Sequence, residues 1–285
     1  MAYLGPQGTY SEEAARRYAS RQGFISPEWL LCRSIVEVLE EVAGGNADIG
    51  VVPAENSIEG SVAVTLDYLA HETTLPIIGE VVIPIRVCLL VHPQAELEKI
   101  AVVYSHPQPL AQCRRHLRQL LPQAEQKAVG STAEAARLVA GGGDKREAAL
   151  GNQSAAGIYG LEVAVSDMQD VTGNATRFLV VGRTPAAPSG YDKTSIVFGF
   201  QNDRPGNLYR ALGVFAERHI NLTKLESRPA KRSLGDYLFF VDMEGHITDE
   251  IVKSALSALE KVCDHLKILG SYPRADKPPS LESSY

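Results

Sequence analysis

The chain has 285 residues, which is enough for about two domains. Its net charge of −6, without a basic cluster, argues against a nucleic-acid partner. No secretion signal opens the chain, and the longest apolar run, 81–91, is interrupted by Pro84 and Arg86 and is too short to span a membrane. Four cysteines without a C-x-x-C pair indicate reduced thiols, so we expect a cytoplasmic protein without a membrane partner. The histidines lack metal-ligand spacing, so no metal site is expected.

Before residue 183, short β-type runs alternate with helical patterns. The expected strands are 49–52, 87–91, 100–104, 148–151 and 178–181. Capping boxes, in which a hydroxyl residue is followed by Glu or Gln three positions later, mark expected helix starts at Thr9, Ser34, Ser105 and Ser131. This alternation predicts an α/β architecture with mixed, largely parallel sheets covered by helices. A ligand is then expected beyond the carboxyl ends of the strands, where helix N-termini point.

Residues 183–191 combine prolines, a glycine and small residues without periodicity, which is typical of a linker. We therefore expect a first domain over 1–183 and a second over 192–274. In the second domain, the expected elements are a strand at 196–200, a helix at 208–215, strands at 221–226 and 237–243, a helix at 251–266 and a strand at 267–272. The order β-α-β-β-α-β is the ferredoxin-like plan.

Two polar segments follow strands of the first domain. Residues 5–9, G-P-Q-G-T, can present backbone N–H groups to an anion, although an ordinary turn is the simpler interpretation. Glu55, Asn56 and Ser57 follow the apolar run 49–52, where a site is expected. The alternative is that Asn56 and Ser57 only cap the next helix.

Two further segments carry polar side chains that could meet a ligand. At about 100° per residue, Ser105, Gln108 and Gln112 share one stripe of an expected helix whose opposite face is apolar. The alternative for Gln112 is a solvated surface amide. In the segment 174–178, N-A-T-R-F, a threonine hydroxyl beside a guanidinium suits an anion that also carries a hydroxyl. The alternative is an edge-strand threonine with a surface arginine.

Together, the ordered motifs resemble those of a known family. G-P-Q-G-T-Y-S, P-A-E-N-S-I-E-G-S-V, S-H-P-Q-P-L-A-Q-C and N-A-T-R-F resemble the prephenate dehydratases, and the part beyond the linker resembles the ACT domain that follows them. The resemblance covers residues 2–274. The chain lacks room ahead of Gly5 for a chorismate mutase module, so it resembles the monofunctional form. In one departure, the G-A-L motif of the effector site reads Gly206-Asn207-Leu208, and asparagine adds bulk and polarity there.

The resemblance implies conversion of prephenate to phenylpyruvate with loss of water and carbon dioxide, in L-phenylalanine biosynthesis. Aromatisation of the ring drives this reaction, so no cofactor is expected. The implied fold is a two-lobed cleft domain similar to type II solute-binding proteins, followed by a ferredoxin-like ACT domain. Thr176 is implied as the essential residue, which we interpret as a hydrogen-bond donor or proton relay to the leaving hydroxyl. Glu55 is a candidate proton source if burial raises its pKa.

The same resemblance implies roles for a wider set of residues. Asn56, Ser105 and Gln112 are implied to orient the substrate. Thr9, Ser57, Gln108, Arg177 and Phe178 are expected at the substrate, with Arg177 paired to a substrate carboxylate. Gly206, Asn207, Leu208, Glu226, Ser227, Arg228 and Pro229 are expected to bind L-phenylalanine as an allosteric inhibitor, in a homodimer or homotetramer. Two alternatives stay open: an arogenate dehydratase, which performs the same chemistry on an amino-acid side chain, and a non-catalytic small-anion receptor with an ACT sensor.

Overall fold

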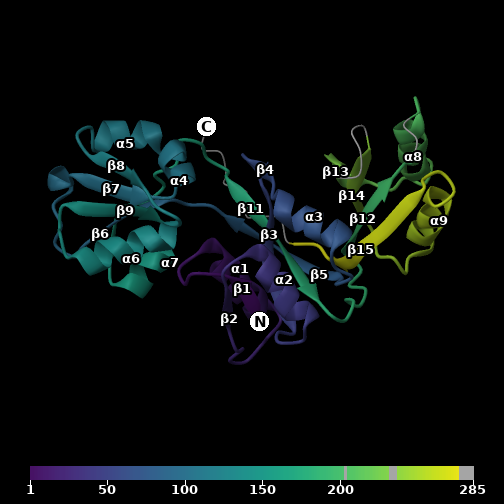
Figure 1. Cartoon of the computed structure of the whole chain (residues 1–285), viewed down its shortest axis with the longest axis horizontal. Coiled ribbons are helices and arrows are strands. Elements are labelled where there is room, and N and C mark those ends of the chain that lie inside the picture. Colours follow the sequence, from purple (N-terminus) through teal and green to yellow (C-terminus); the bar gives the residue numbers. More distant parts are fainter. Residues whose placement is uncertain (202–203, 231–235, 276–285) are drawn as a thin grey trace.

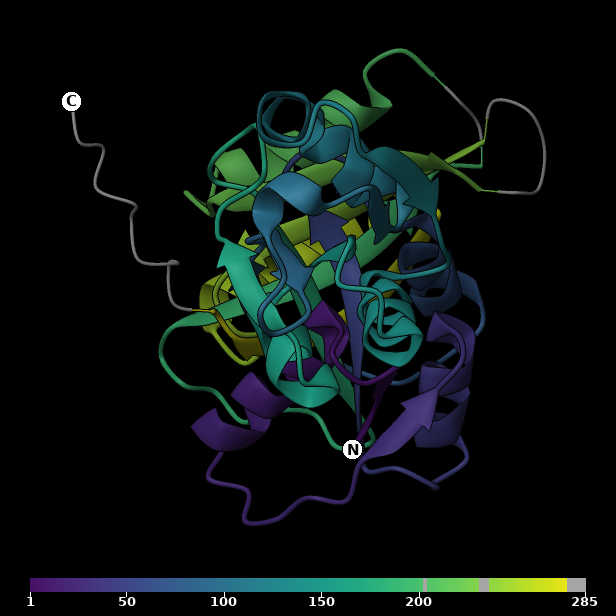
Figure 2. The same ribbon diagram turned by 90° about the vertical axis from the view of Figure 1, so that its left-hand side faces the viewer.

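The computed structural model describes residues 1–201, 204–230 and 236–275, and these form three units arranged in a row (Figure 1). Each unit is built on one β-sheet. The central unit contains the N-terminus, and a second α/β lobe and the C-terminal domain flank it on either side (Figure 1). Figure 2 views the row end-on from the side of the second lobe. No helix within the described ranges is long and apolar enough to cross a membrane.

The first lobe has the strand order β2-β1-β3-β11-β5, with β4 paired to β3. Its strands are β1 (Ala2–Leu4), β2 (Leu30–Cys32), β3 (Ile49–Asn56), β4 (Gly60–Ser61), β5 (Ile77–Pro84) and β11 (Ala175–Gly182). Helix α1 (Tyr10–Arg21) covers one face, while α2 (Ile35–Ala43) and α3 (Ala63–His71) cover the other. Strand β11 runs antiparallel between β3 and β5 although it is far from both in sequence.

The second lobe is inserted between β5 and β11, so the chain crosses between the lobes twice. Its sheet has the order β10-β6-β9-β7-β8. The strands are β6 (Cys88–Val91), β7 (Val102–Ser105), β8 (Glu125–Ala128), β9 (Glu147–Gly151) and β10 (Glu162–Val165), and the helices are η1 (Leu97–Lys99), α4 (Pro107–Gln112), α5 (Arg114–Leu120), α6 (Thr132–Gly142) and α7 (Gln153–Tyr159). The α/β architecture predicted for this part of the chain is confirmed.

Three of the four predicted capping boxes are confirmed, and the fourth is wrong. Thr9, Ser34 and Ser131 each accept a hydrogen bond from the backbone N–H of the glutamate three residues later. Ser105 is instead the last residue of β7, and α4 begins at Pro107 with His106 as its N-cap. The reason is that a residue before proline is excluded from the helical region; His106 accordingly has ψ near 149°.

The C-terminal domain has the predicted ferredoxin-like order. Its elements are β12 (Asp192–Gly199), α8 (Asn207–Ala216), β13 (Leu222–Pro229), β14 (Tyr237–Glu244), α9 (Glu250–Leu259) and β15 (His265–Pro273), in the sheet order β13-β14-β12-β15. Both helices pack on one face of this sheet. Side chains of the other face, including Phe240 and Leu269, share a single apolar core with Leu66 and Leu69 of α3.

Candidate active site

The carboxyl end of β3 and the start of β11 lie side by side next to the crossings between the lobes. In their antiparallel register Thr176 pairs with Asn56, and Arg177 pairs with Glu55. Successive side chains on a strand point to opposite faces of the sheet, and paired residues share a face. Asn56 and Thr176 therefore lie on one face, and Glu55 and Arg177 lie on the other.

A chain of side-chain amides leads from Thr176 toward the second lobe. The Asn56 Nδ2 donates to Thr176 Oγ1 at 3.0 Å and to Asn174 Oδ1 at 2.7 Å. The Asn174 Nδ2 in turn donates to Gln112 Oε1 at 3.2 Å. Within the described residues, the Thr176 hydroxyl makes no other hydrogen bond, so its proton is available to a ligand. The structure thus brings three of the predicted site residues together: Asn56, Gln112 and Thr176.

Asn174 is the functional candidate that sequence reasoning missed. It stands within the N-A-T-R-F motif, so a signal existed, but that motif drew attention to Thr176 and Arg177. Asn174 is buried and joins β11 to α4 of the other lobe through Gln112. The Gln112 Nε2 is buried without a hydrogen-bond partner in the described part of the chain, which leaves a donor for a bound molecule.

Several other predicted residues have structural partners. Ser105 is fully buried and donates to the Leu150 carbonyl at 2.9 Å. Phe178 is 2% exposed within the core of the first lobe, which differs from the prediction that it contacts substrate. Ser57 Oγ accepts from the Ala175 N–H at 3.0 Å and thereby fixes the start of β11. Gln108 lies half-buried in the first turn of α4.

Arg177 does not meet the prediction that it pairs with a substrate carboxylate. Its guanidinium donates to Glu80 at 2.7 Å, to Asp242 at 2.6 Å and to the Tyr272 hydroxyl at 2.8 Å. Its side chain is only 13% exposed. The physical reason is the strand pleat, which directs Arg177 away from Thr176 and into the C-terminal domain.

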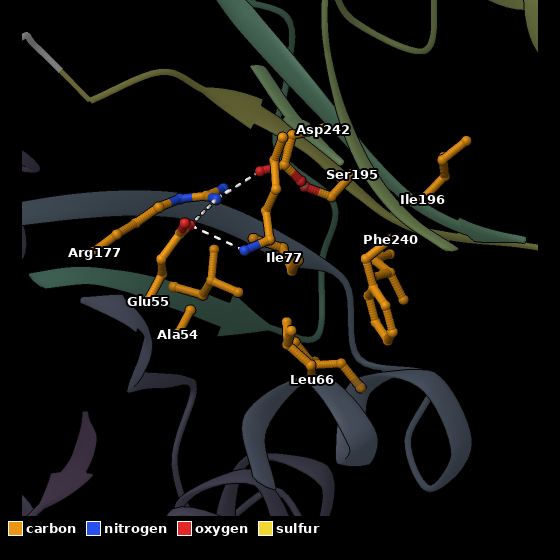
Figure 3. Close-up of a pocket in the computed structure, with 13 residues that line it drawn as sticks. Ala54, Glu55, Leu66, Ile77, Arg177, Ser195, Ile196, Phe240 and Asp242 are labelled. Atoms are coloured by element: carbon orange, nitrogen blue, oxygen red, sulfur yellow. Dashed lines mark hydrogen bonds and ion pairs between the residues drawn. The ribbon is translucent and has the colours of Figure 1, made fainter. Parts of the chain in front are cut away.

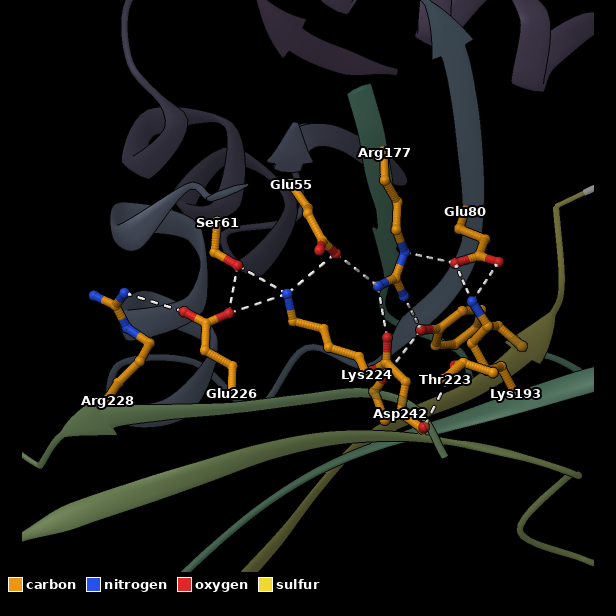
Figure 4. Close-up of polar contacts among 12 residues, drawn as sticks. Glu55, Ser61, Glu80, Arg177, Lys193, Thr223, Lys224, Glu226, Arg228 and Asp242 are labelled. Carbon is orange, nitrogen blue, oxygen red and sulfur yellow. Dashed lines mark hydrogen bonds and ion pairs between the residues drawn. The ribbon is translucent and has the colours of Figure 1, made fainter. Parts of the chain in front are cut away.

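Glu55 shares this orientation. Its carboxylate lies 3.1 Å from Lys224 and 3.7 Å from Arg177, on the face opposite Thr176. This placement differs from the hypothesis that Glu55 supplies a proton beside Thr176. Figure 4 shows Glu55 between Lys224 and Arg177.

A cavity of about 600 Å³ lies between the lobes. It is lined by residues 4–6 and 9–11 around the start of α1, by Arg33, and by residues 130–132, Glu134 and Arg137 around the start of α6. Its lining includes Thr9, whose hydroxyl also caps α1. A volume of this size suits a small organic ligand. Helix N-termini favour anions, so this cavity is suited to a carboxylate.

The C-terminal domain has a cavity of its own, of about 360 Å³. It is lined by Phe200, Arg204, Pro205, Gly206, Asn207, Leu208, Tyr209, Tyr237 and Phe239, and so contains the predicted G-N-L motif. Ser227 and Pro229 pair with Phe239 and Tyr237, so they lie on the same face of the sheet. Glu226 and Arg228 point the other way and bind Ser61 and Asp67 of the first lobe, which differs from the prediction that their side chains contact the effector. The E-S-R-P motif is therefore divided between the two faces.

No group of three or more His, Cys, Asp or Glu side chains that could hold a metal ion occurs among residues 1–201, 204–230 and 236–275.

The strand ends around Asn56 and Thr176, next to the crossings between the lobes, form a polar hinge. Two α/β lobes with this hinge, joined to a ferredoxin-like domain with its own cavity, define a cleft protein with an attached ligand-binding domain. The family model described as prephenate dehydratase matches residues 1–186, and that of the ACT domain matches residues 194–261. The chain belongs to the prephenate dehydratase family.

Relatives with curated descriptions match along almost the whole chain. A bifunctional chorismate mutase/prephenate dehydratase of Aquifex aeolicus is 44% identical over 96% of this chain and 74% of its own length. A prephenate dehydratase of Methanocaldococcus jannaschii is 39% identical over 97% of this chain and 98% of its own. The crystal structure of a prephenate dehydratase from Arthrobacter aurescens in complex with L-Phe has a TM-score of 0.87 and 38% identity, covering 98% of this chain and 92% of that one.

Proposed function

We propose that this chain is a prephenate dehydratase that converts prephenate to phenylpyruvate, water and carbon dioxide in L-phenylalanine biosynthesis. The observation that carries the proposal is the Thr176 hydroxyl at the hinge between the lobes. Asn56 donates to its oxygen at 3.0 Å, so the hydroxyl is oriented while its own proton is free for a ligand.

In the proposed reaction, the bond between the ring and its carboxylate breaks, and its electron pair enters the ring. On the opposite side of the ring, the carbon–oxygen bond of the ring hydroxyl breaks, and the ring becomes aromatic. The leaving hydroxyl departs as water once it gains a proton, and Thr176 donates a hydrogen bond to it or relays that proton. A positioned group of this kind typically contributes about 100- to 10,000-fold in rate.

The amide chain has a supporting role in this proposal. Asn56 and Asn174 hold Thr176 and Gln112 in fixed relative positions, which reduces the entropy lost when the transition state forms. The unpartnered Gln112 Nε2 is proposed to donate to the substrate. The cavity at the starts of α1 and α6, with Thr9 in its lining, is proposed to accept a substrate carboxylate.

A direct comparison of substrates tests the proposal. Purified protein is offered prephenate and arogenate, and the keto-acid or amino-acid product is measured. Turnover of prephenate above arogenate supports it. Preference for arogenate would assign the chain to arogenate dehydratases, and binding of both without turnover would make it a small-anion receptor.

We further propose that L-phenylalanine binds the cavity around Gly206–Leu208 and inhibits the enzyme. The relative crystallised with L-Phe supports this assignment. Ser227 and Pro229 are exposed on the edge strand β13 near that cavity, so a second ACT domain could complete it in a homodimer or dimer of dimers. The test is calorimetric titration of the whole protein with phenylalanine, combined with its oligomeric state by light scattering.

A cytoplasmic location completes the proposal. It rests on the sequence expectation and on the four cysteines, which are all free thiols.

A further inference from the structure

The ACT domain and the first lobe are joined by a continuous interface. Phe240, Leu269 and Tyr272 of the ACT sheet belong to the same apolar core as Leu66 and Ile77 of the first lobe. The cavity left between the two units is only about 20 Å³, and Figure 3 shows Glu55, Arg177 and Asp242 at its polar end. Because the two units pack this closely, a shift of the ACT sheet displaces the side chains of the first lobe that contact it.

One ion-pair cluster at this interface ends on Arg177. Asp242 of β14 accepts from Arg177 at 2.6 Å through one carboxylate oxygen and from Ser195 at 2.5 Å through the other. Glu80 binds the other side of the guanidinium and also lies 3.0 Å from Lys193 (Figure 4). Glu80 and Asp242 are each 5% exposed, so solvent screens this cluster little.

A second cluster ends on Glu55. Lys224 of β13 lies 3.1 Å from the Glu55 carboxylate and donates to Ser61 at 2.8 Å. Glu226 accepts from Ser61 and lies 3.0 Å from Lys224, so the ammonium is held on both sides (Figure 4). The Lys224 side chain is 12% exposed.

The two clusters meet where the Glu55 carboxylate lies 3.7 Å from the Arg177 guanidinium, and they hold the two strand ends that carry the candidate active site. Arg177 directly follows Thr176 on β11, and Glu55 directly precedes Asn56 on β3. Asp242 and Lys224 are themselves cross-strand partners on the ACT sheet. Asp242 and Lys224 therefore bind the side chains of Arg177 and Glu55. These two residues are the neighbours of Thr176 and Asn56 and lie on the opposite face of the first lobe's sheet.

The ACT sheet has its ligand cavity on its other face. Tyr237 and Phe239 line that cavity, whereas Asp242 lies on the face toward the first lobe. Along β13, Ser227 and Glu226 are divided in the same way. A change at the cavity that shifts β13 or β14 must therefore move Lys224 or Asp242.

We propose that Asp242 and Lys224 are positioning residues for the dehydratase reaction. Acting through Arg177 and Glu55, they set the alignment of Thr176 with Asn56, and they carry the response to a ligand in the ACT cavity. This inference rests on the proposed function. It goes beyond that function because the ACT domain would also position β3 and β11, the strands that carry Asn56 and Thr176.

The test compares Asp242→Asn and Lys224→Met with a matched control, Lys267→Met, in the full-length protein. Lys267 crosses the same interface, but it donates to the carbonyls of Leu69, Ala70 and Thr73 at the end of α3, away from the hinge. For Asp242→Asn and Lys224→Met we expect kcat to fall about 10- to 100-fold, the scale of a misplacement by about 1 Å, with KM nearly unchanged. Phenylalanine should still bind by calorimetry while its inhibition weakens. Lys224→Arg keeps the positive charge, so its kcat should stay near that of the wild type.

Wild-type turnover of prephenate is measured in the same assay, so failure of the proposed function is seen separately. If Asp242→Asn does not fold, Lys224→Met and Lys224→Arg carry the test alone. Wild-type kcat and inhibition in folded Lys224→Met would overturn the inference. An equal loss of kcat in Lys267→Met would also overturn it, because the effect would then be general weakening of the interface.

Discussion

Thr176 and Arg177 are consecutive on β11, yet their side chains find partners on opposite faces of the sheet. The Thr176 hydroxyl accepts from Asn56 at 3.0 Å on the side of the hinge, whereas Arg177 donates to Asp242 at 2.6 Å across the domain boundary. A side chain proposed to act on substrate and one that anchors the ACT domain are therefore separated by a single peptide bond. Displacement of one residue is transmitted to the other through the strand.

Replacement of Thr176 by valine should abolish the hydroxyl while keeping the β-branched shape. We expect kcat to fall about 100- to 10,000-fold, because a positioned donor to the leaving hydroxyl is lost. The melting temperature should change little, since the side chain is only partly buried. Thr176→Ser keeps the hydroxyl and should retain much of the activity. Turnover of the valine variant near that of the wild type would contradict the role assigned to Thr176.

Replacement of Asn174 by alanine should reduce both stability and rate. It removes partners of Asn56 and Gln112, and unsatisfied buried polar groups cost about 1–3 kcal/mol each. The control is Asn152→Ala: Asn152 is also buried, and it caps α7 by accepting from Ala155 N at 3.0 Å. This control should lose about 1 kcal/mol of stability and keep its kcat. Equal kcat in both variants would mean that Asn174 is only structural.

Acid should weaken the ion-pair cluster around Asp242. Burial raises the pKa of Asp242, but Arg177, the hydrogen bond from Ser195 and Lys193 outweigh burial, so its pKa lies below the ordinary value. A carboxylate with a lowered folded pKa contributes stability that is complete above the unfolded pKa, about 3.9, and is lost as pH falls through the folded pKa.

Denaturant unfolding from pH 7 to pH 3 measures this contribution. The free energy of unfolding of the wild type should exceed that of Asp242→Asn by a constant amount at neutral pH, and the difference should shrink below about pH 4. For Lys267→Met the difference should stay level over the same range, because the ammonium remains protonated. A difference for Asp242→Asn that is level down to pH 3 would show that folding does not lower the pKa of Asp242, because the folded and unfolded carboxyl groups would then take up protons together.

Phenylalanine binding should respond to Asn207 and Ser227 in opposite directions. Asn207 lines the ACT cavity where the family motif has alanine, so Asn207→Ala should enlarge the cavity and lower the Kd. Ser227→Ala should weaken inhibition, which in allosteric proteins typically reflects about 1–3 kcal/mol of coupling. Calorimetry gives the Kd and initial rates give the inhibition. No heat of binding in the wild type, with rates indifferent to phenylalanine, would leave the ACT domain as a structural module.

Local sequence patterns were sufficient to predict much of this fold. The β-α-β-β-α-β order after the linker, the strands at 49–52 and 148–151, and the caps at Thr9, Ser34 and Ser131 depend on periodicity and on contacts within a few residues. Strands β8 and β10 lie at the two edges of their sheet and were missed. All four residues of β8 are exposed, so the strand shows no apolar alternation.

Only the tertiary structure decided which side chains meet. The sequence alone placed Asn56, Gln112 and Thr176 in separate motifs, and the antiparallel pairing of β11 with β3, together with Asn174, brought them into one chain of hydrogen bonds. The same strand pairing directs the side chains of Arg177 and Glu55 toward the ACT domain instead of the substrate. Strand pairing over more than a hundred residues and the burial of a sheet face between domains depend on long-range packing, which no local window of sequence encodes.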